Sequence, residues 1–114
     1  MTLKQFLTKL KTTPLQITFA ETMQVIEDNY NFTPTAFTNG EIENKIGENL
    51  GSCKLFAFAI HQQFTKEETL SCFGEHYQSV LNDISGTSHQ NIRNFMKTGF
   101  ETLSFKTKTL ELKV

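Results

Sequence analysis

The chain has 114 residues, a length typical of one domain, and its 11 basic and 12 acidic residues leave a formal net charge of -1. This balance argues against a general nucleic-acid binder, which needs a surplus of Lys and Arg to neutralise phosphates. The longest apolar run, residues 55–60, is too short to span a bilayer, and two cysteines fit a reducing compartment rather than a disulfide scaffold. We therefore expect a single domain over residues 1–114, located in the cytoplasm, that binds neither nucleic acid nor membrane.

Helical spacing dominates the first 30 residues. A Thr2-x-x-Gln5 capping box precedes the first amphipathic stretch, which is expected to be a short helix. Its apolar face comprises Leu3, Phe6, Leu7 and Leu10. Thr13, followed by Pro14 at the first helical position, is expected to cap a second helix of about four turns. That helix should end before Pro34, because the residue that precedes a proline avoids the α region.

Residues 33–52 lack a helical pattern and are expected to be irregular. Asn39-Gly40 is a turn signal, and three of the six glycines fall within residues 40–51. Ser52 is then expected to open a helix. Because residues 55–60 are apolar on every side, this helix is predicted to be the central buried element.

Two further helices are predicted in the second half of the chain. A capping box at Thr65-x-x-Glu68 should start one helix that continues to Leu81. Ser88 is expected to cap a shorter helix that ends at Gly99, because a glycine after the last turn is a frequent helix terminator.

The C-terminal tail changes from a helical to an alternating pattern, which is typical of a strand. The alternation over residues 102–108 slips at Thr109, so the two halves of the tail face opposite ways. The strand needs a partner, which is either residues 33–37 or a second copy of the chain. The predicted fold class is α+β, mainly α: a compact helical domain of about five helices with a small antiparallel β pair that involves the C-terminal tail.

Four segments of the chain carry a resemblance to a known family. They are Thr35-Ala36-Phe37-x-Asn39-Gly40, Asn44-x-x-Gly47-x-Asn49-x-Gly51-Ser52-Cys53-Lys54-x-Phe56-Ala57-Phe58, Leu70-x-Cys72-Phe73-Gly74-x-x-Tyr77 and His89-x-Asn91-Ile92-Arg93-x-Phe95-Met96-x-x-Gly99. Together they resemble the HopJ type III effector family over residues 15–105. The resemblance implies a small bacterial protein, and the family takes its name from a protein proposed to be injected into plant hosts by a type III secretion system. It implies no established reaction, cofactor or catalytic residue.

Residues 47–54 contain the strongest candidate for a binding site. If Gly51 or Ser52 caps the following helix, the free N–H groups and the positive end of the dipole attract an anion, with Lys54 in the first turn. The alternative is that these residues only cap a buried helix. Nearby amides and the single arginine have the same two interpretations, as ligand contacts or as partners of loop backbone and acidic groups. The predicted ligand-binding residues are Asn39, Asn44, Asn49, Ser52, Lys54, Asn91 and Arg93.

A small Cys-His hydrolase or transferase is the second hypothesis. A thiol in the first turn of a helix is more nucleophilic than a free one, and a histidine can act as its base, so the predicted catalytic residues are Cys53 and His89. The alternative is that Cys53 packs as a small hydrophobe. Cys72 and His76 share a helix face, but no second ligand pair accompanies them. We therefore expect no metal and no other cofactor.

These observations favour a small binding or interaction module, either a monomer or a homodimer. Its polar site is predicted between the loop of residues 39–54 and the helix of residues 89–93, with a small anionic ligand or a protein as partner. The alternatives are the Cys-His enzyme and a type III secreted effector that acts on a host protein. Secreted effectors generally begin with a long, disordered, Ser-rich segment, whereas a capped amphipathic helix is predicted here from Thr2, which favours the cytoplasm.

Overall fold

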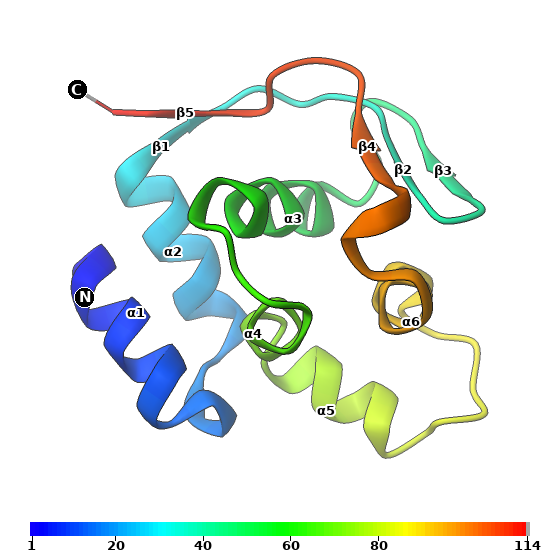
Figure 1. Cartoon of the computed structure of the whole chain (residues 1–114), viewed down its shortest axis with the longest axis horizontal. Coiled ribbons are helices and arrows are strands. Elements are labelled where there is room, and N and C mark those ends of the chain that lie inside the picture. The colour runs from blue at the N-terminus through cyan, green and yellow to red at the C-terminus, as the bar shows by residue number, and fades with distance from the viewer. Residues whose placement is uncertain (114) are drawn as a thin grey trace.

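The computed structural model of this protein describes residues 1–113 as α-helices packed beside short antiparallel strands (Figure 1). The helices are α1 (Leu3–Thr12), α2 (Phe19–Asn29), α3 (Leu50–Gln62), α4 (Lys66–Cys72), α5 (Glu75–Leu81) and α6 (Gln90–Thr98), with short 3-10 helices η1 (Pro14–Gln16) and η2 (Gly99–Thr102). The strands are β1 (Tyr30–Phe32), β2 (Phe37–Asn39), β3 (Ile42–Asn44), β4 (Leu103–Phe105) and β5 (Leu110–Leu112). The predicted class, α+β and mainly α, is confirmed.

The apolar helix α3 runs through the middle of the molecule, as its sequence predicts (Figure 1). Phe56 is fully buried at its centre, and its ring contacts those of Phe37, Phe73 and Phe95 at centroid distances of 6.2, 5.4 and 4.9 Å. These separations lie in the range of favourable aromatic pairs. One helix therefore links the strands, α4 and α6 into a common core.

The C-terminal tail forms two strands rather than one. Strand β4 pairs with β2, which also pairs with β3, whereas β5 pairs with β1, all antiparallel. The predicted partner, residues 33–37, does lie beside the tail, since Phe37 pairs with Phe105 and the backbones of Thr33 and Ala36 hydrogen-bond to those of Thr109 and Lys106, but residues 33–36 connect β1 to β2 without forming a strand. Pro34 lies in that connection, and a proline lacks the N–H group that a strand ladder needs.

Helix α2 begins five residues later than the sequence pattern suggests. Thr13 makes no side-chain cap, and Pro14 starts only the short helix η1. Thr18 instead caps α2 in a full capping box with Glu21, whose carboxylate also accepts a hydrogen bond from the backbone N–H of Thr18. This reciprocal pair satisfies two otherwise free N–H groups, which explains why the helix begins there.

The helix predicted over residues 65–81 is divided into α4 and α5 at Gly74, so the helices exceed the predicted number of about five. Gly74 has φ +57, and a Cβ atom there would lie 2.7 Å from the backbone nitrogen of Phe19. Thr22 of α2 donates a 2.8 Å hydrogen bond to the carbonyl of Cys72, the last residue of α4. The break lets the α2 backbone approach the α4–α5 corner directly.

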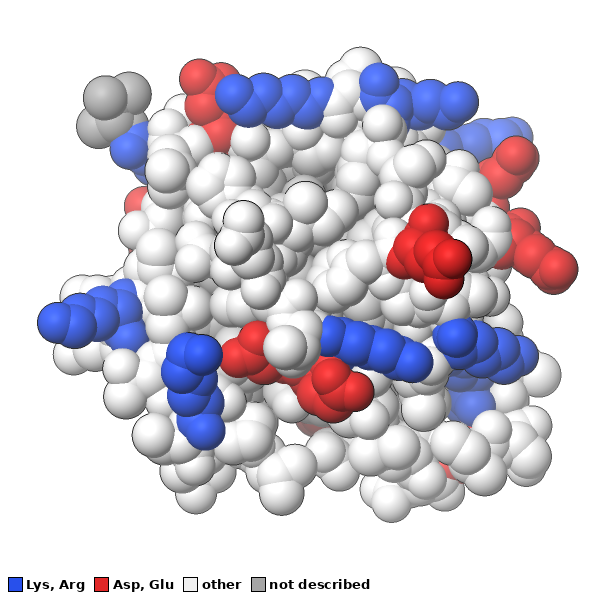
Figure 2. Space-filling view, viewed as in Figure 1, with Lys and Arg blue, Asp and Glu red and all other residues white. Residues whose placement is uncertain are grey.

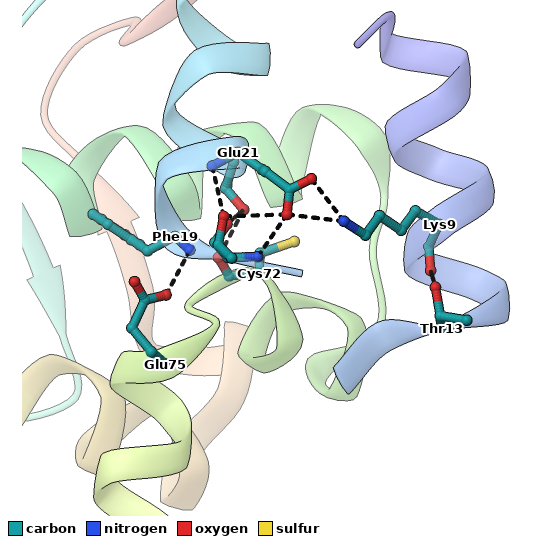
Figure 3. Close-up of polar contacts among 8 residues, drawn as sticks. Lys9, Thr13, Phe19, Glu21, Cys72 and Glu75 are labelled. Atoms are coloured by element: carbon teal, nitrogen blue, oxygen red, sulfur yellow. Dashed lines mark hydrogen bonds and ion pairs between the residues drawn. The ribbon is translucent and has the colours of Figure 1, made fainter. Parts of the chain in front are cut away.

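The N-terminal helix α1 is tied to α2 by packing and by an ion pair. Phe6 and Leu10 are buried in the core, and Lys9 contacts the carboxylate of Glu21 at 2.7 Å (Figure 3). On the face shown in Figure 2, acidic and basic side chains are interspersed, in keeping with the balanced composition. None of the helices within residues 1–113 is long and apolar enough to cross a membrane.

Candidate functional site

A cavity of about 480 Å³ lies where the N-termini of α3 and α6 meet. It is lined by the first turns of both helices, by the residues that precede them, and by side chains from α2, β3, α5 and the turn between α4 and α5. These residues are Phe19, Ile42, Asn49, Gly51, Ser52, Phe73, His76, His89, Gln90, Asn91 and Ile92. The cavity therefore brings together four of the predicted site residues: Asn49, Ser52, His89 and Asn91.

Both helices enter this cavity without side-chain caps. The predicted caps Ser52 and Ser88 are wrong, because Asn49 and His89 precede the helices, each in the left-handed region with φ 51 and φ 52, and neither caps with its side chain. In α3 the first N–H group with a helical hydrogen bond is that of Cys53, which donates to the carbonyl of Asn49. In α6 it is that of Arg93, which donates to the carbonyl of His89. Within residues 1–113, the preceding N–H groups of each first turn have no acceptor in the protein.

Two of the side chains that could cap these turns, those of Asn49 and Ser88, make other contacts. Asn49 donates through Nδ2 to Asn44 Oδ1 at 2.7 Å, which turns its amide away from its own helix. The Ser88 hydroxyl lies 3.4 Å from Nη2 of Arg93, which donates to it. Uncapped first turns carry the positive end of the helix dipole, so both helices direct partial positive charge at the cavity.

Four asparagines form a hydrogen-bonded network, here called the amide clasp, in which three members are buried and Asn49 is exposed: Asn39, Asn44, Asn49 and Asn91. Asn44 Oδ1 accepts hydrogen bonds from Asn49 at 2.7 Å and from Asn91 at 2.9 Å. Asn91 Oδ1 accepts from Asn39 at 3.0 Å, and Asn39 is fully buried. The clasp ties the end of β3 to the first turns of α3 and α6. Asn39 and Asn44 are thus placed behind the cavity, as supports of its wall.

Two histidines stand side by side at the cavity. The rings of His76 and His89 have centroids 5.1 Å apart, and the ring of Phe19 meets that of His76 edge-on at 4.8 Å. Phe19 also stacks on Phe73 with centroids 6.2 Å apart. Sequence reasoning missed Phe19 and considered His76 only as a metal ligand, because nothing in the local pattern indicates that α2 and α5 face the α6 N-terminus.

Lys54 and Arg93 were predicted to contact the ligand, and neither lines the cavity. Lys54 places its ammonium group 5.0 Å from the centre of the Phe32 ring. Arg93 is 9% exposed and donates hydrogen bonds to the carbonyls of Ser88 and Ile84. Its only ion pair within residues 1–113 is a 3.9 Å contact with Asp83. Arg93 therefore holds the loop that leads into α6.

The thiol of Cys53 is fully buried and does not line the cavity. Its sulfur lies 3.7 Å from the carbonyl oxygen of Thr35, and burial raises its pKa above the usual range despite that contact and the charge of Lys54. Cys72 is also a buried free thiol whose pKa is raised by burial. The part of the chain that the structure describes contains no cluster of three His, Cys, Asp or Glu side chains able to hold a metal ion.

Comparison with known proteins gives two matches. The family described as HopJ type III effector protein matches residues 3–110. A crystal structure described as that of the unknown-function protein VPA0580 shares 53% sequence identity and superposes with a TM-score of 0.96, covering 99% of this chain and 95% of that chain. None of the curated proteins matches the sequence.

Proposed function

This chain belongs to the HopJ family, and we propose that it is a small binding module that takes an anionic ligand between the N-termini of α3 and α6. The observation that carries the proposal is the meeting of two uncapped first turns at one cavity. Each helix N-terminus is equivalent to about half a positive charge and presents free N–H donors. Two of them directed at one volume favour an oxyanion such as a phosphate or carboxylate group.

The side chains around the cavity support the same sign of charge. His76 and His89 line it, and an imidazole can donate a hydrogen bond or carry a positive charge. The carboxylate next to this pair, that of Glu75, accepts a 2.8 Å hydrogen bond from the backbone N–H of Phe19 (Figure 3). This carboxylate therefore satisfies a backbone N–H group at the N-terminus of α2. The positive ends of the dipoles also make the cavity a poor place for a metal cation.

The enzyme hypothesis draws no support from this geometry. A nucleophilic thiol must be ionised and reachable by its substrate, whereas Cys53 is fully buried and its pKa is raised. His89 is exposed at the cavity that Cys53 does not line. We therefore place binding before Cys-His catalysis.

Secretion as an effector that acts on a host protein is the second candidate function, and it rests on the description of the family. Its test is independent of ligand binding. Export through a type III system should depend on residues 1–12, which include α1 of the folded protein. Export that persists without those residues would contradict the effector function in that form.

The anion site can be tested with a charge placed inside it. We expect sodium phosphate to raise the Tm above that in sodium chloride of equal ionic strength, because a ligand at about 100 times its Kd stabilises a protein by about 2.7 kcal/mol. In Ser52→Asp a carboxylate occupies the first turn of α3, which suits the helix dipole and repels the ligand. This variant should fold and lose the response to phosphate.

Ser79→Asp is the matched control, since it adds the same charge at an exposed position of α5 that does not line the cavity. It should respond to phosphate like the wild type. An unchanged wild-type Tm, or equal responses of the two variants, would count against the proposed site.

A further inference from the structure

We infer that the ligand carries its oxyanion on a planar aromatic ring, an inference that rests on the proposed anion site. The first argument is size. Cavities of about 300–1,000 Å³ are typical for drug-sized organic ligands, and this one measures about 480 Å³. A bare phosphate ion would leave most of that volume to water, so a larger molecule fits the site better.

The second argument is the composition of the walls. The first turns of α3 and α6 form a polar end, whereas Phe19, Phe73, Ile42 and Ile92 contribute apolar surface to the same cavity. Phe73 and Ile92 are each 2% exposed and back the wall as part of the core, so the apolar surface open to a ligand comes mainly from the half-buried Phe19 and Ile42. A ligand that matches both parts has a charged group at one end and an apolar body at the other.

The third argument is the shape of the apolar wall. Phe19 stacks nearly parallel on Phe73, at an interplanar angle of 7°, and meets His76 edge-on. Phe73 is almost fully enclosed, so the half-buried ring of Phe19 is the flat surface left at the cavity, and a further aromatic ring can stack on it or meet it edge-on. The apolar body is therefore best matched by a planar ring.

The fourth argument is the position of Phe19 relative to the donors. A Cβ atom added at Gly51 would lie 2.8 Å from Cζ of Phe19, so the tip of this ring touches the first turn of α3. A ring bound against Phe19 thus places a substituent at the free N–H groups of Gly51 and Ser52. The same contact explains why the second residue of α3 is a glycine, since a side chain would displace the ring.

The experiment compares affinities by isothermal titration calorimetry on the full chain. Phenyl phosphate should bind about tenfold or more tighter than inorganic phosphate, because burial of the ring adds apolar contact to the same anion site. Phenol, which lacks the oxyanion, should show no measurable binding. Benzoate and acetate make the same comparison for a carboxylate. Tighter binding of benzoate than of acetate would support an aromatic ligand whose oxyanion is a carboxylate.

Phe19→Leu keeps an apolar side chain and removes the flat ring. It should reduce the advantage of phenyl phosphate and leave the affinity for inorganic phosphate unchanged. Phe64→Leu is the matched control, because Phe64 is also a half-buried phenyl group on the core but does not line this cavity. It should bind both ligands like the wild type.

The outcomes separate the two proposals. Equal affinities for phenyl phosphate and phosphate would overturn the aromatic class and leave the anion site in place. Binding of phenol as tight as that of phenyl phosphate would also overturn it, as would an equal loss of both ligands in Phe19→Leu. If neither phosphate compound binds, the proposed function itself fails, and the ligand class with it.

Discussion

At the scale of single residues, burial decides what the two cysteines can do. Cys53 follows the first turn of α3, which by local rules favours a reactive thiolate, yet the side chain is fully enclosed. Moving a thiolate out of water costs more free energy than the nearby charge of Lys54 restores, so burial raises the pKa of Cys53. The same residue in an open cleft would be a candidate nucleophile, whereas here it packs as a small apolar side chain.

We expect both thiols to resist modification in the folded protein. Ellman's reagent should titrate neither Cys53 nor Cys72 under native conditions and both in denaturant, because each is fully buried and each has a raised pKa. Mass spectrometry after brief native alkylation should find unmodified protein. If Cys53 in the native protein is labelled faster than a free cysteine, the result would support the Cys-His enzyme hypothesis.

At the scale of elements, the amide clasp sets the spacing of the two first turns. Asn44 Oδ1 is shared by Asn49 beside α3 and Asn91 in α6, so one side chain positions both helices around the cavity. Asn44 is 3% exposed and Asn91 is 6% exposed, and no water is needed to satisfy their amides, since every buried side-chain polar atom within residues 1–113 has a partner. A satisfied network of this kind holds a geometry that separate surface contacts would not.

Asn44→Ala should destabilise the protein by about 1–3 kcal/mol, because it leaves the buried Nδ2 group of Asn91 without its acceptor, whereas the exposed Asn49 can donate to water instead. Denaturant unfolding measures the loss. Asn82→Ala, at an exposed position after α5, should change the free energy of unfolding by less than about 0.5 kcal/mol. Similar values for the two variants would mean that the clasp does not bear on stability.

Capping boxes make the helix starts sensitive to acid. Glu21 and Glu68 are the third residues of α2 and α4, and both have a pKa lowered from 4.5, Glu21 mainly by Lys9 and Glu68 mainly by the backbone N–H of Thr65. A carboxyl with a lowered folded-state pKa adds stability above its unfolded value, and that stability disappears as the pH falls through the folded value. These helices should therefore loosen in acid rather than in alkali.

The Tm should consequently stay level as the pH falls from 7 toward 5 and should decrease below about 4.5, the unfolded value. Glu21→Gln should lower the Tm at neutral pH and flatten the decrease in acid. Glu27→Gln, at an exposed position of the same helix, should keep the wild-type profile. A Glu21→Gln profile that follows the wild type in acid would disprove this role for the Lys9–Glu21 pair.

At the scale of the whole molecule, α1 belongs to the core. Phe6 is fully buried and its ring lies 6.0 Å from that of Phe58 in α3, so the first helix contacts the central one. Domains of this size are stable by only about 5–15 kcal/mol. A segment that contributes a buried phenyl ring to the centre cannot leave without a large cost, which makes α1 an integral part of the fold.

Phe6→Ala should cost about 3–5 kcal/mol, the range for truncating a buried phenylalanine. Leu7→Ala, at a half-buried position of the same helix, should cost less. Denaturant unfolding compares the two. A loss below about 1 kcal/mol for Phe6→Ala would indicate that α1 docks loosely, and would make residues 1–12 a better candidate for a detachable export segment.

Much of the helical structure could be predicted because it depends on neighbours in the chain. The Thr2–Gln5 and Thr65–Glu68 boxes form as predicted, and the apolar run of residues 55–60 lies in the central helix. The helix starts predicted at Ser52 and Ser88 were both displaced, to Asn49 three residues before Ser52 and to His89 one residue after Ser88. Both new starts have a left-handed backbone and no side-chain cap, so the preference of serine for the cap position did not decide either of them.

Local patterns in the sequence were sufficient to predict the fold class, the family, the central helix and a set of polar residues around the 39–54 loop and the start of α6. Which of these residues meet depends on the tertiary structure. It brought Asn39 and Asn44 to Asn91, which lie 52 and 47 positions away, as supports, and it placed His76 beside His89 at the cavity. It also directed Lys54 and Arg93 elsewhere and buried Cys53. The physical reason is that caps and helical periodicity act over one turn of chain, whereas burial and the meeting of two helix ends depend on how the whole core packs.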